Sequence, residues 1–211
     1  MTVAFILMLL SLWPLYDHYG HPVRVYDGAT GEPIEGALAV GRWGASGWIS
    51  MVSSREVCYK LLVARSGTNG MLYMPRWSWS GRALSLSHDD PLFFPGGHFF
   101  LYRPGYYEGP REANPPGQRI MWRDPRTGME RLHFIEWNQS NAECNAILQV
   151  DSAIQLGPVF DAMLQEAKGL ASTPNERIVL SNIRWARNYL LFGSEAATEM
   201  NRQERAKEEK K

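Results

Sequence analysis

The most polar cluster in the middle of the chain is His88-Asp89-Asp90. Imidazole and carboxylate groups bind divalent metals when they converge, and on a strand His88 and Asp90 would share one face. A metal-dependent hydrolase that uses these two side chains and a second histidine is one hypothesis. The simpler interpretation, which we favour, is a loop between strands in which an aspartate bonds backbone amides ahead of Pro91.

Motifs for other reactions are missing from the sequence. It contains no Gly-x-Ser-x-Gly, His-Glu-x-x-His, phosphate-binding loop or dinucleotide fingerprint. We therefore predict a protein that is not an enzyme and that has no catalytic residue, no metal site and no cofactor.

Aromatic side chains are the other candidates for binding, since the chain has eight Trp and nine Tyr. Trp77 and Trp79 would lie on the same face of a strand. Exposed with Tyr106, they could form a platform for a carbohydrate or a protein partner. For the aromatic residues as a group we favour packing in the core and at the edges of a β-sandwich. The Trp77-x-Trp79 pair is the best candidate for a surface patch.

The start of the chain bears on its compartment. Residues 3–16 are almost wholly apolar, too few for a transmembrane span of ~20 residues but suited to the apolar core of a signal peptide. Two features do not fit a signal peptide, because no Lys or Arg precedes Arg24 and no small-x-small cleavage site follows. The alternative is a buried N-terminal strand or helix. We favour residues 1–20 as a signal peptide or membrane anchor.

The two cysteines, Cys58 and Cys144, are too far apart for a CxxC redox or zinc motif. They are either buried free thiols in a cytosolic protein or a disulfide in an exported one. Export to the periplasm or cell envelope would favour the disulfide.

Charge and composition limit the partners. Lys+Arg and Asp+Glu number 22 each, so no charge excess favours nucleic acid or an anionic membrane. The hydrophobic share of 45% is that of a globular chain.

The first half of the chain has the pattern of strands and turns. Residues 22–43 predict a strand, a turn at Asp27–Gly31 and a second strand, apolar from Ile34 to Val40 and buried on both faces. Asn69-Gly70 predicts a hairpin between two β-prone runs. We expect further strands over residues 98–103 and 130–137, with irregular surface chain over 107–127.

After Cys144 the apolar period becomes helical. Residues 156–169 predict one helix, with Pro158 in its first turn and Gly169 at its end. The next helix has Thr173 as N-cap, Pro174 at its first position and Glu176 completing a capping box. Residues 201–211 are charged, lack an apolar face and predict a frayed tail.

Three segments together resemble a known family. They are Val25-x-Asp27-x-x-Thr30-Gly31-x-Pro33-Ile34-x-Gly36-Ala37-x-x-Val40, the run from Thr68 to Pro75, and Tyr102-x-Pro104-Gly105-Tyr106. This order resembles the carboxypeptidase regulatory-like domain, a transthyretin-like antiparallel β-sandwich. The middle segment departs from the family by lacking its aspartate. The wider layout is similar to a group of uncharacterised bacterial envelope proteins.

The resemblance and the residue patterns described above together predict a mainly β fold with four segments. These are the signal peptide or anchor at 1–20, the sandwich at 21–140, a helical hairpin packed on it at 141–200, and a disordered tail at 201–211. The resemblance implies an exported protein with a binding or structural role toward a protein partner, with an immunity or inhibitor role as one specific form. A carbohydrate-binding module that uses Trp77 and Trp79 is the alternative.

Overall fold

The computed structural model describes residues 22–50, 53–74, 94–110, 114–115, 117–142 and 149–208. The strands are β1 (Pro22–Asp27), β2 (Leu38–Ser50), β3 (Ser53–Arg65), β4 (Met71–Tyr73), β5 (Phe94–Tyr102), β6 (Tyr106–Glu108) and β7 (Gln118–Arg123). The helices are α2 (Gly128–Ala142), α3 (Gln149–Leu170), α4 (Pro174–Phe192) and α5 (Ser194–Glu208).

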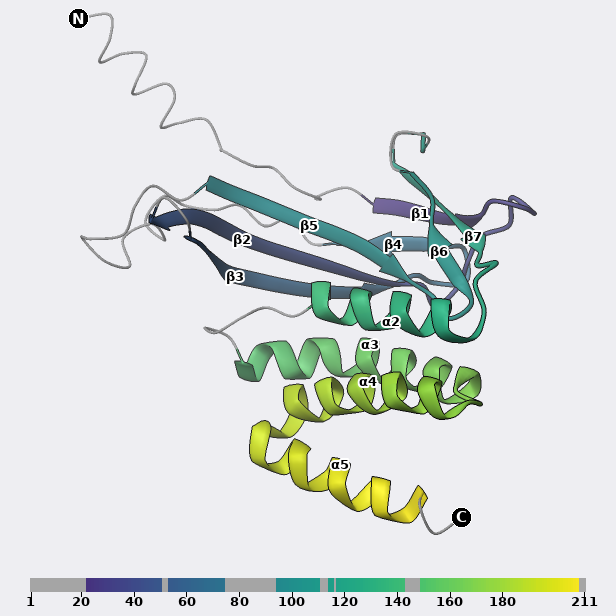
Figure 1. Cartoon of the computed structure of the whole chain (residues 1–211). Coiled ribbons are helices and arrows are strands. Elements are labelled where there is room, and N and C mark those ends of the chain that lie inside the picture. The colour runs from purple at the N-terminus through teal and green to yellow at the C-terminus, as the bar shows by residue number, and fades with distance from the viewer. Residues whose placement is uncertain are drawn as a thin grey trace, which may run out of the picture.

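The strands form two sheets and the helices form a separate layer. One sheet has the order β4-β1-β7-β6 and the other the order β3-β2-β5. The helices lie together on one side of the β3-β2-β5 sheet (Figure 1). Among the described strands, every pair is antiparallel except β1 with β7, which is parallel.

Strand β2 lies in the middle of the molecule. Ala39 belongs to an apolar core that the two sheets share, whereas Leu38 and Val40 belong to a second core made with the helices. The exposure of all three side chains is 4% or less. The prediction that this segment is a strand buried on both faces is confirmed, although its paired region begins only at Leu38.

The predicted fold class is correct only in part. Two sheets packed face to face are followed by helices, but helices α2 to α5 give the described chain a mixed α and β character rather than a mainly β one. The predicted helical hairpin corresponds to α3 and α4, which α2 and α5 flank on either side in sequence.

The prediction of a last strand over residues 130–137 is wrong, because this segment belongs to helix α2. Its buried apolar residues Leu132, Ile135 and Ala142 follow helical spacing. The apparent period of two arose from Phe134, which is only half-buried and stacks on Trp137 with ring centroids 6.3 Å apart.

The turn at Asn69-Gly70 exists, but it does not join a hairpin. Gly70 has a φ of +73°, as a tight turn requires. The strands on either side, β3 and β4, nevertheless belong to different sheets, and β4 pairs with β1. Strands β1 and β2 likewise lie in different sheets, so residues 22–43 are not a hairpin either.

Two further segments are more regular than predicted. Residues 107–127 contain most of β6 and all of β7 rather than only irregular chain. Residues 201–208 continue helix α5 instead of fraying. Arg184 of α4 pairs with Glu204 at 2.8 Å, which ties this part of α5 to the molecule.

The start of α4 is as predicted. The side chain of Thr173 accepts from the backbone of Glu176, and Glu176 bonds back to the backbone of the cap. Pro158, by contrast, lies inside α3 because that helix begins at Gln149.

Candidate functional site

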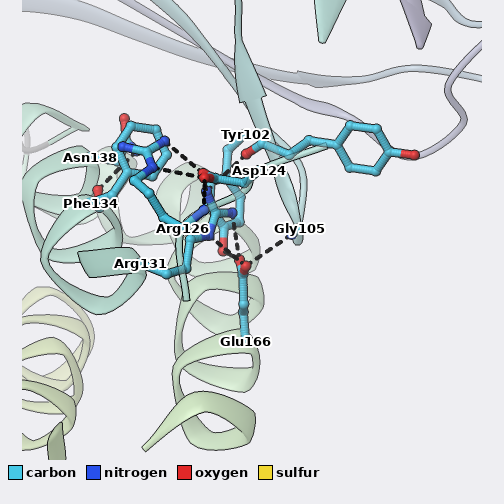
Figure 2. Close-up of polar contacts among 9 residues, drawn as sticks. Tyr102, Gly105, Asp124, Arg126, Arg131, Phe134, Asn138 and Glu166 are labelled. Atoms are coloured by element: carbon cyan, nitrogen blue, oxygen red, sulfur yellow. Dashed lines mark hydrogen bonds and ion pairs between the residues drawn. The ribbon is translucent and has the colours of Figure 1, made fainter. Parts of the chain in front are cut away.

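A buried cluster of charged side chains lies where α2 and α3 meet the ends of the strands (Figure 2). Arg131 of α2 is at its centre, with its side chain 2% exposed. Its guanidinium pairs with Asp124, which follows β7, and with Glu166 of α3. The two bonds to Glu166 run from Nε at 2.8 Å and from Nη2 at 3.1 Å. One arginine therefore links two helices to the end of a strand.

Glu166 also reaches the other side of the cluster. The Tyr102 hydroxyl of β5 donates to Oε2 at 2.5 Å, and the Gly105 N–H donates to Oε1 at 2.9 Å. Burial, reinforced by the negative charge of Glu166, raises the pKa of Tyr102. The tyrosine therefore stays a hydrogen-bond donor at any physiological pH.

Arg126 completes the cluster. It donates to both oxygens of Asp124, at 2.8 and 2.6 Å, and its guanidinium lies 3.7 Å from the ring centroid of Phe134. Burial alone would raise the pKa of Asp124, but hydrogen bonds from Arg126 and the charge of Arg131 outweigh it, so the pKa is lowered. The two arginines and the two carboxylates of the cluster thus carry equal and opposite charge, and they form ion pairs and hydrogen bonds with one another. This arrangement positions α2 and α3 on the sheets.

Asp27, at the end of β1, is a second buried acid with a structural role. Its Oδ1 accepts from the backbone N–H of Ala29 at 2.8 Å, and its Oδ2 accepts from the Tyr106 hydroxyl at 2.9 Å. The bond from Ala29 is the main cause of the lowered pKa of Asp27. Tyr106, which the sequence suggested as a binding residue, is only 9% exposed, and its hydrogen bond to Asp27 stabilises the turn that follows β1.

The β4-β1-β7-β6 sheet has one face in the core and one face outward. Along β1, Val23 and Val25 are buried whereas Arg24 is exposed and Tyr26 is half-buried. The pairing register carries this alternation across the sheet. We call the outward set the open face; it comprises Tyr107, Gln118, Ile120, Trp122, Arg24, Tyr26, Met71 and Tyr73.

Trp122 lies flat on the open face. A Cβ added at Gly28 would come within 2.4 Å of Cε2, 2.5 Å of Cδ2 and 2.7 Å of Cε3 of the indole. Cδ2 and Cε2 form the bond that the two rings of the indole share. Because other ring atoms lie on both sides of this bond in the ring plane, an added atom can come this close to it only from above or below the plane. One face of the indole therefore rests on the Gly28 backbone. The residue is 40% exposed, so part of the side chain away from Gly28 is open to solvent.

A second glycine supports the same ring. A Cβ at Gly109 would lie 3.0 Å from the indole Nε1. The N–H of Gly109 donates to Ile120 O at 3.1 Å, and the N–H of Gly28 donates to Met121 O at 2.8 Å. Both glycines are thus fastened by backbone hydrogen bonds to the strand that carries Trp122. They form a fixed seat for its ring.

Polar groups lie on the same face. The Arg24 guanidinium donates from Nη1 to the Tyr26 hydroxyl at 3.1 Å and from Nε to the Met71 sulfur at 3.2 Å. Arg24 pairs in register with Gln118 of β7. The open face therefore combines an aromatic plane with hydrogen-bonding groups.

Most of the residues singled out in the sequence lie outside the described residues. These are Trp77, Trp79, His88, Asp90 and Cys144, together with residues 1–20. The backbone of Cys58 pairs with Gly44 in the β2-β3 ladder. Within the described chain, no group of three or more His, Cys, Asp or Glu is placed to hold a metal ion.

Two further side chains of the helices are placed by the structure. Asn138 of the triplet Asn138-Gln139-Ser140, which fits a glycosylation acceptor, is 4% exposed and donates to Phe134 O at 3.0 Å. Trp185 of α4 is 38% exposed and stacks on Tyr189 with ring centroids 5.1 Å apart.

Comparison with known proteins finds no match to a family model, a curated protein or a solved structure. None of the helices in the described part of the chain is long and apolar enough to cross a membrane.

The open face was not recognised from the sequence, although the signal is present in part. Alternation places Ile120 and Trp122 on one side of a strand, with Met121 on the other. The pairing of β7 with β1 brings Gly28 into contact with Trp122. These two residues are 94 positions apart in the sequence. No local pattern predicts this contact.

Proposed function

We propose that this chain is a non-enzymatic binding protein of the cell envelope and that the open face is its ligand-binding surface. One observation carries the proposal. The outward side of a sheet in a sandwich is ordinarily polar, whereas on the open face Trp122 and Tyr73 are 40% and 61% exposed, with Met71, Tyr26 and Ile120 in the register between them. An exposed apolar patch with a polar surround is typical of an interaction site.

The charged cluster supports a role without catalysis. Asp124 and Arg131 have side chains that are 1% and 2% exposed. Glu166, at 10%, is engaged by Arg131, Tyr102 and Gly105. A catalytic acid or base must reach a substrate proton, and these groups reach one another instead.

The envelope location and the transthyretin-like identity rest on the sequence. The apolar residues 3–16 and the motif from Val25 to Val40 support them, and two sheets packed face to face are consistent with such a sandwich. Export would favour a disulfide between Cys58 and Cys144. The N-terminal residue of the mature protein from fractionated cells tests the location. Full recovery from the cytosol with two free thiols would contradict it.

Photo-crosslinking tests the binding surface without assuming a ligand class. A benzophenone amino acid at Tyr26 places the reactive group on the open face, and it inserts into C–H bonds of any ligand nearby. The matched control is the same group at Lys207, an exposed position on α5. We expect a discrete adduct in the producing cells from position 26 and none from position 207. Equal products from both positions, or none from position 26, would overturn the proposal.

A further inference from the structure

We infer that the open face binds a saccharide, with the indole of Trp122 stacked on the apolar C–H face of a pyranose ring. The inference rests on the proposed function, because it names the ligand class for that surface. A pyranose with equatorial substituents has a flat apolar face and a rim of hydroxyl groups. Its complement is a flat aromatic plane bordered by hydrogen-bonding side chains.

The indole ring of Trp122, positioned by Gly28 and Gly109, provides the aromatic plane. The ring is held at a fixed level because Gly28 lies beneath its shared bond and Gly109 lies beside Nε1. Any larger residue at position 28 would push the ring off the sheet, since the added Cβ would come within 2.4 Å of it. A ring that is already immobile loses little conformational entropy when a ligand stacks on it.

Polar side chains farther along the same face provide the hydrogen-bonding groups. Arg24, Tyr26 and Gln118 project from the same face of β1 and β7. A guanidinium donates hydrogen bonds, whereas a phenol and an amide both donate and accept. Tyr26 is level with Ile120, two positions from Trp122, whereas Arg24 is level with Gln118, four positions or about 13 Å away. Tyr26 can therefore bond a hydroxyl group of the stacked ring, and Arg24 and Gln118 can bond rings farther along an oligosaccharide.

The same observations disfavour other ligand classes. Nucleic acid needs several cations along its backbone, but on the open face Arg24 is the one charged member of the set defined above. Anchor residues of protein partners enter pockets, whereas an indole seated flat on backbone presents a plane. An adduct with protein or nucleic acid is therefore an outcome that would count against a saccharide.

The test compares variants in binding to hexasaccharides of β-1,4-linked N-acetylglucosamine and of β-1,4-linked glucose. Binding is measured by isothermal titration calorimetry on the full chain. Gly28→Ala is the decisive variant, because it keeps the indole but displaces it. Trp122→Ala removes the plane. We expect the native chain to bind at least one hexasaccharide and each variant to weaken that binding about tenfold or more, the usual effect of losing one stacking platform.

Two control variants match these changes. Trp185→Ala removes an indole of nearly equal exposure, 38% against 40%, from α4. Gly169→Ala adds a Cβ that meets nothing within 4 Å. Both are expected to bind as the native chain does, and near-UV circular dichroism of all four variants confirms that each is folded. If Gly28→Ala is unfolded, the inference is tested by comparing the hexasaccharide binding of Trp122→Ala with that of Trp185→Ala.

Several results would overturn the inference. They are failure of the native chain to bind either hexasaccharide, native-like binding by folded Gly28→Ala, and equal weakening by Trp185→Ala and Trp122→Ala. If the native chain binds neither sugar but position 26 crosslinks to another ligand, the saccharide inference fails and the open face remains a binding surface. If position 26 gives no adduct either, both proposals fail.

Discussion

At the scale of single residues, Arg131 is the side chain on which two buried carboxylates depend. Substitution of Arg131 by methionine keeps much of its apolar stem but leaves Asp124 and Glu166 without their shared cation. Removing one partner of a buried ion pair costs about 3–5 kcal/mol. We expect a loss of this size in the free energy of unfolding, measured by urea denaturation.

The control is Arg187→Met. Arg187 pairs with Asp161 at 2.8 Å, but the two side chains are 23% and 53% exposed. Such a pair contributes less than about 1 kcal/mol. Equal losses for the two variants would show that the Arg131 cluster does not behave as a buried ion network.

Glu176 makes stability depend on pH. Its Oε2 accepts from the N–H of Thr173 at 2.8 Å and from that of Ser172 at 2.9 Å, and these bonds lower its pKa from 4.5 to about 2. Because the pKa is lowered on folding, this contribution is fully present above 4.5 and is lost as the pH falls through about 2. Glu176→Gln should therefore melt below the native protein at about pH 6, and the gap should close toward about pH 2. A gap independent of pH would contradict this.

These residues also show what sequence can predict at this scale. The capping box was predictable because Thr173, Pro174 and Glu176 interact within one turn. The cluster of Arg131 with Glu166 was not, because its members are 35 residues apart and meet only through packing of α2 on α3. A buried arginine has no sequence pattern of its own.

At the scale of elements, helix α2 shows how a buried polar residue can obscure the helical spacing of the core positions. Gln139 is 1% exposed and donates to Ile183 O of α4 at 3.0 Å. Together with Leu132 and Ile135 it completes the helical face, but a pattern based on apolar residues alone omits it. Gln139 lies beyond the segment 130–137, and the few residues within that segment are too short a window to separate helix from strand periods.

The turn before β4 depends on Gly70. A Cβ there would lie 2.5 Å from Val25 O, a backbone atom that is fixed because it accepts from Ile34 N at 3.0 Å. Gly70→Ala therefore combines an unfavourable positive φ with a backbone clash. We expect it to cost about 2–4 kcal/mol in unfolding free energy.

Gly31→Ala isolates the first of those two effects. Gly31 has a φ of +71°, close to the +73° of Gly70, but a Cβ there would meet nothing within 4 Å. Its expected cost is about 1 kcal/mol. The difference in unfolding free energy between the two variants measures the cost of the close contact between position 70 and the Val25 carbonyl. Equal costs would mean that this contact is not tight.

At the scale of the whole molecule, β2 connects two cores that no single segment reveals. Its continuous apolar run correctly predicted burial on both faces. It did not predict that one face belongs to a sandwich and the other to a helical layer. The parallel pairing of β1 with β7 likewise depends on residues almost a hundred positions apart, so the sequence predicted a sandwich but not its strand order.

The layered arrangement also argues against an independent sandwich with an accessory hairpin. Leu38, Val40, Leu61 and Tyr102 face the helices from the β3-β2-β5 sheet and are at most 4% exposed. A chain ending at Arg126 would keep every described strand but expose these four side chains. At about 1.5–3 kcal/mol for each buried apolar side chain, the loss is about 6–12 kcal/mol, comparable to the total stability of about 5–15 kcal/mol of a typical domain.

We therefore expect the chain that ends at Arg126 not to form a native monomer. Size-exclusion chromatography should show aggregates, and the exposed sheet should bind a hydrophobic dye such as ANS. The full chain under the same conditions is the control. A monomeric fragment with native near-UV circular dichroism would instead mean that the sandwich is a domain in its own right. In the layered fold, the helices complete the core that holds β2 and, through the other sheet, keep the open face in register.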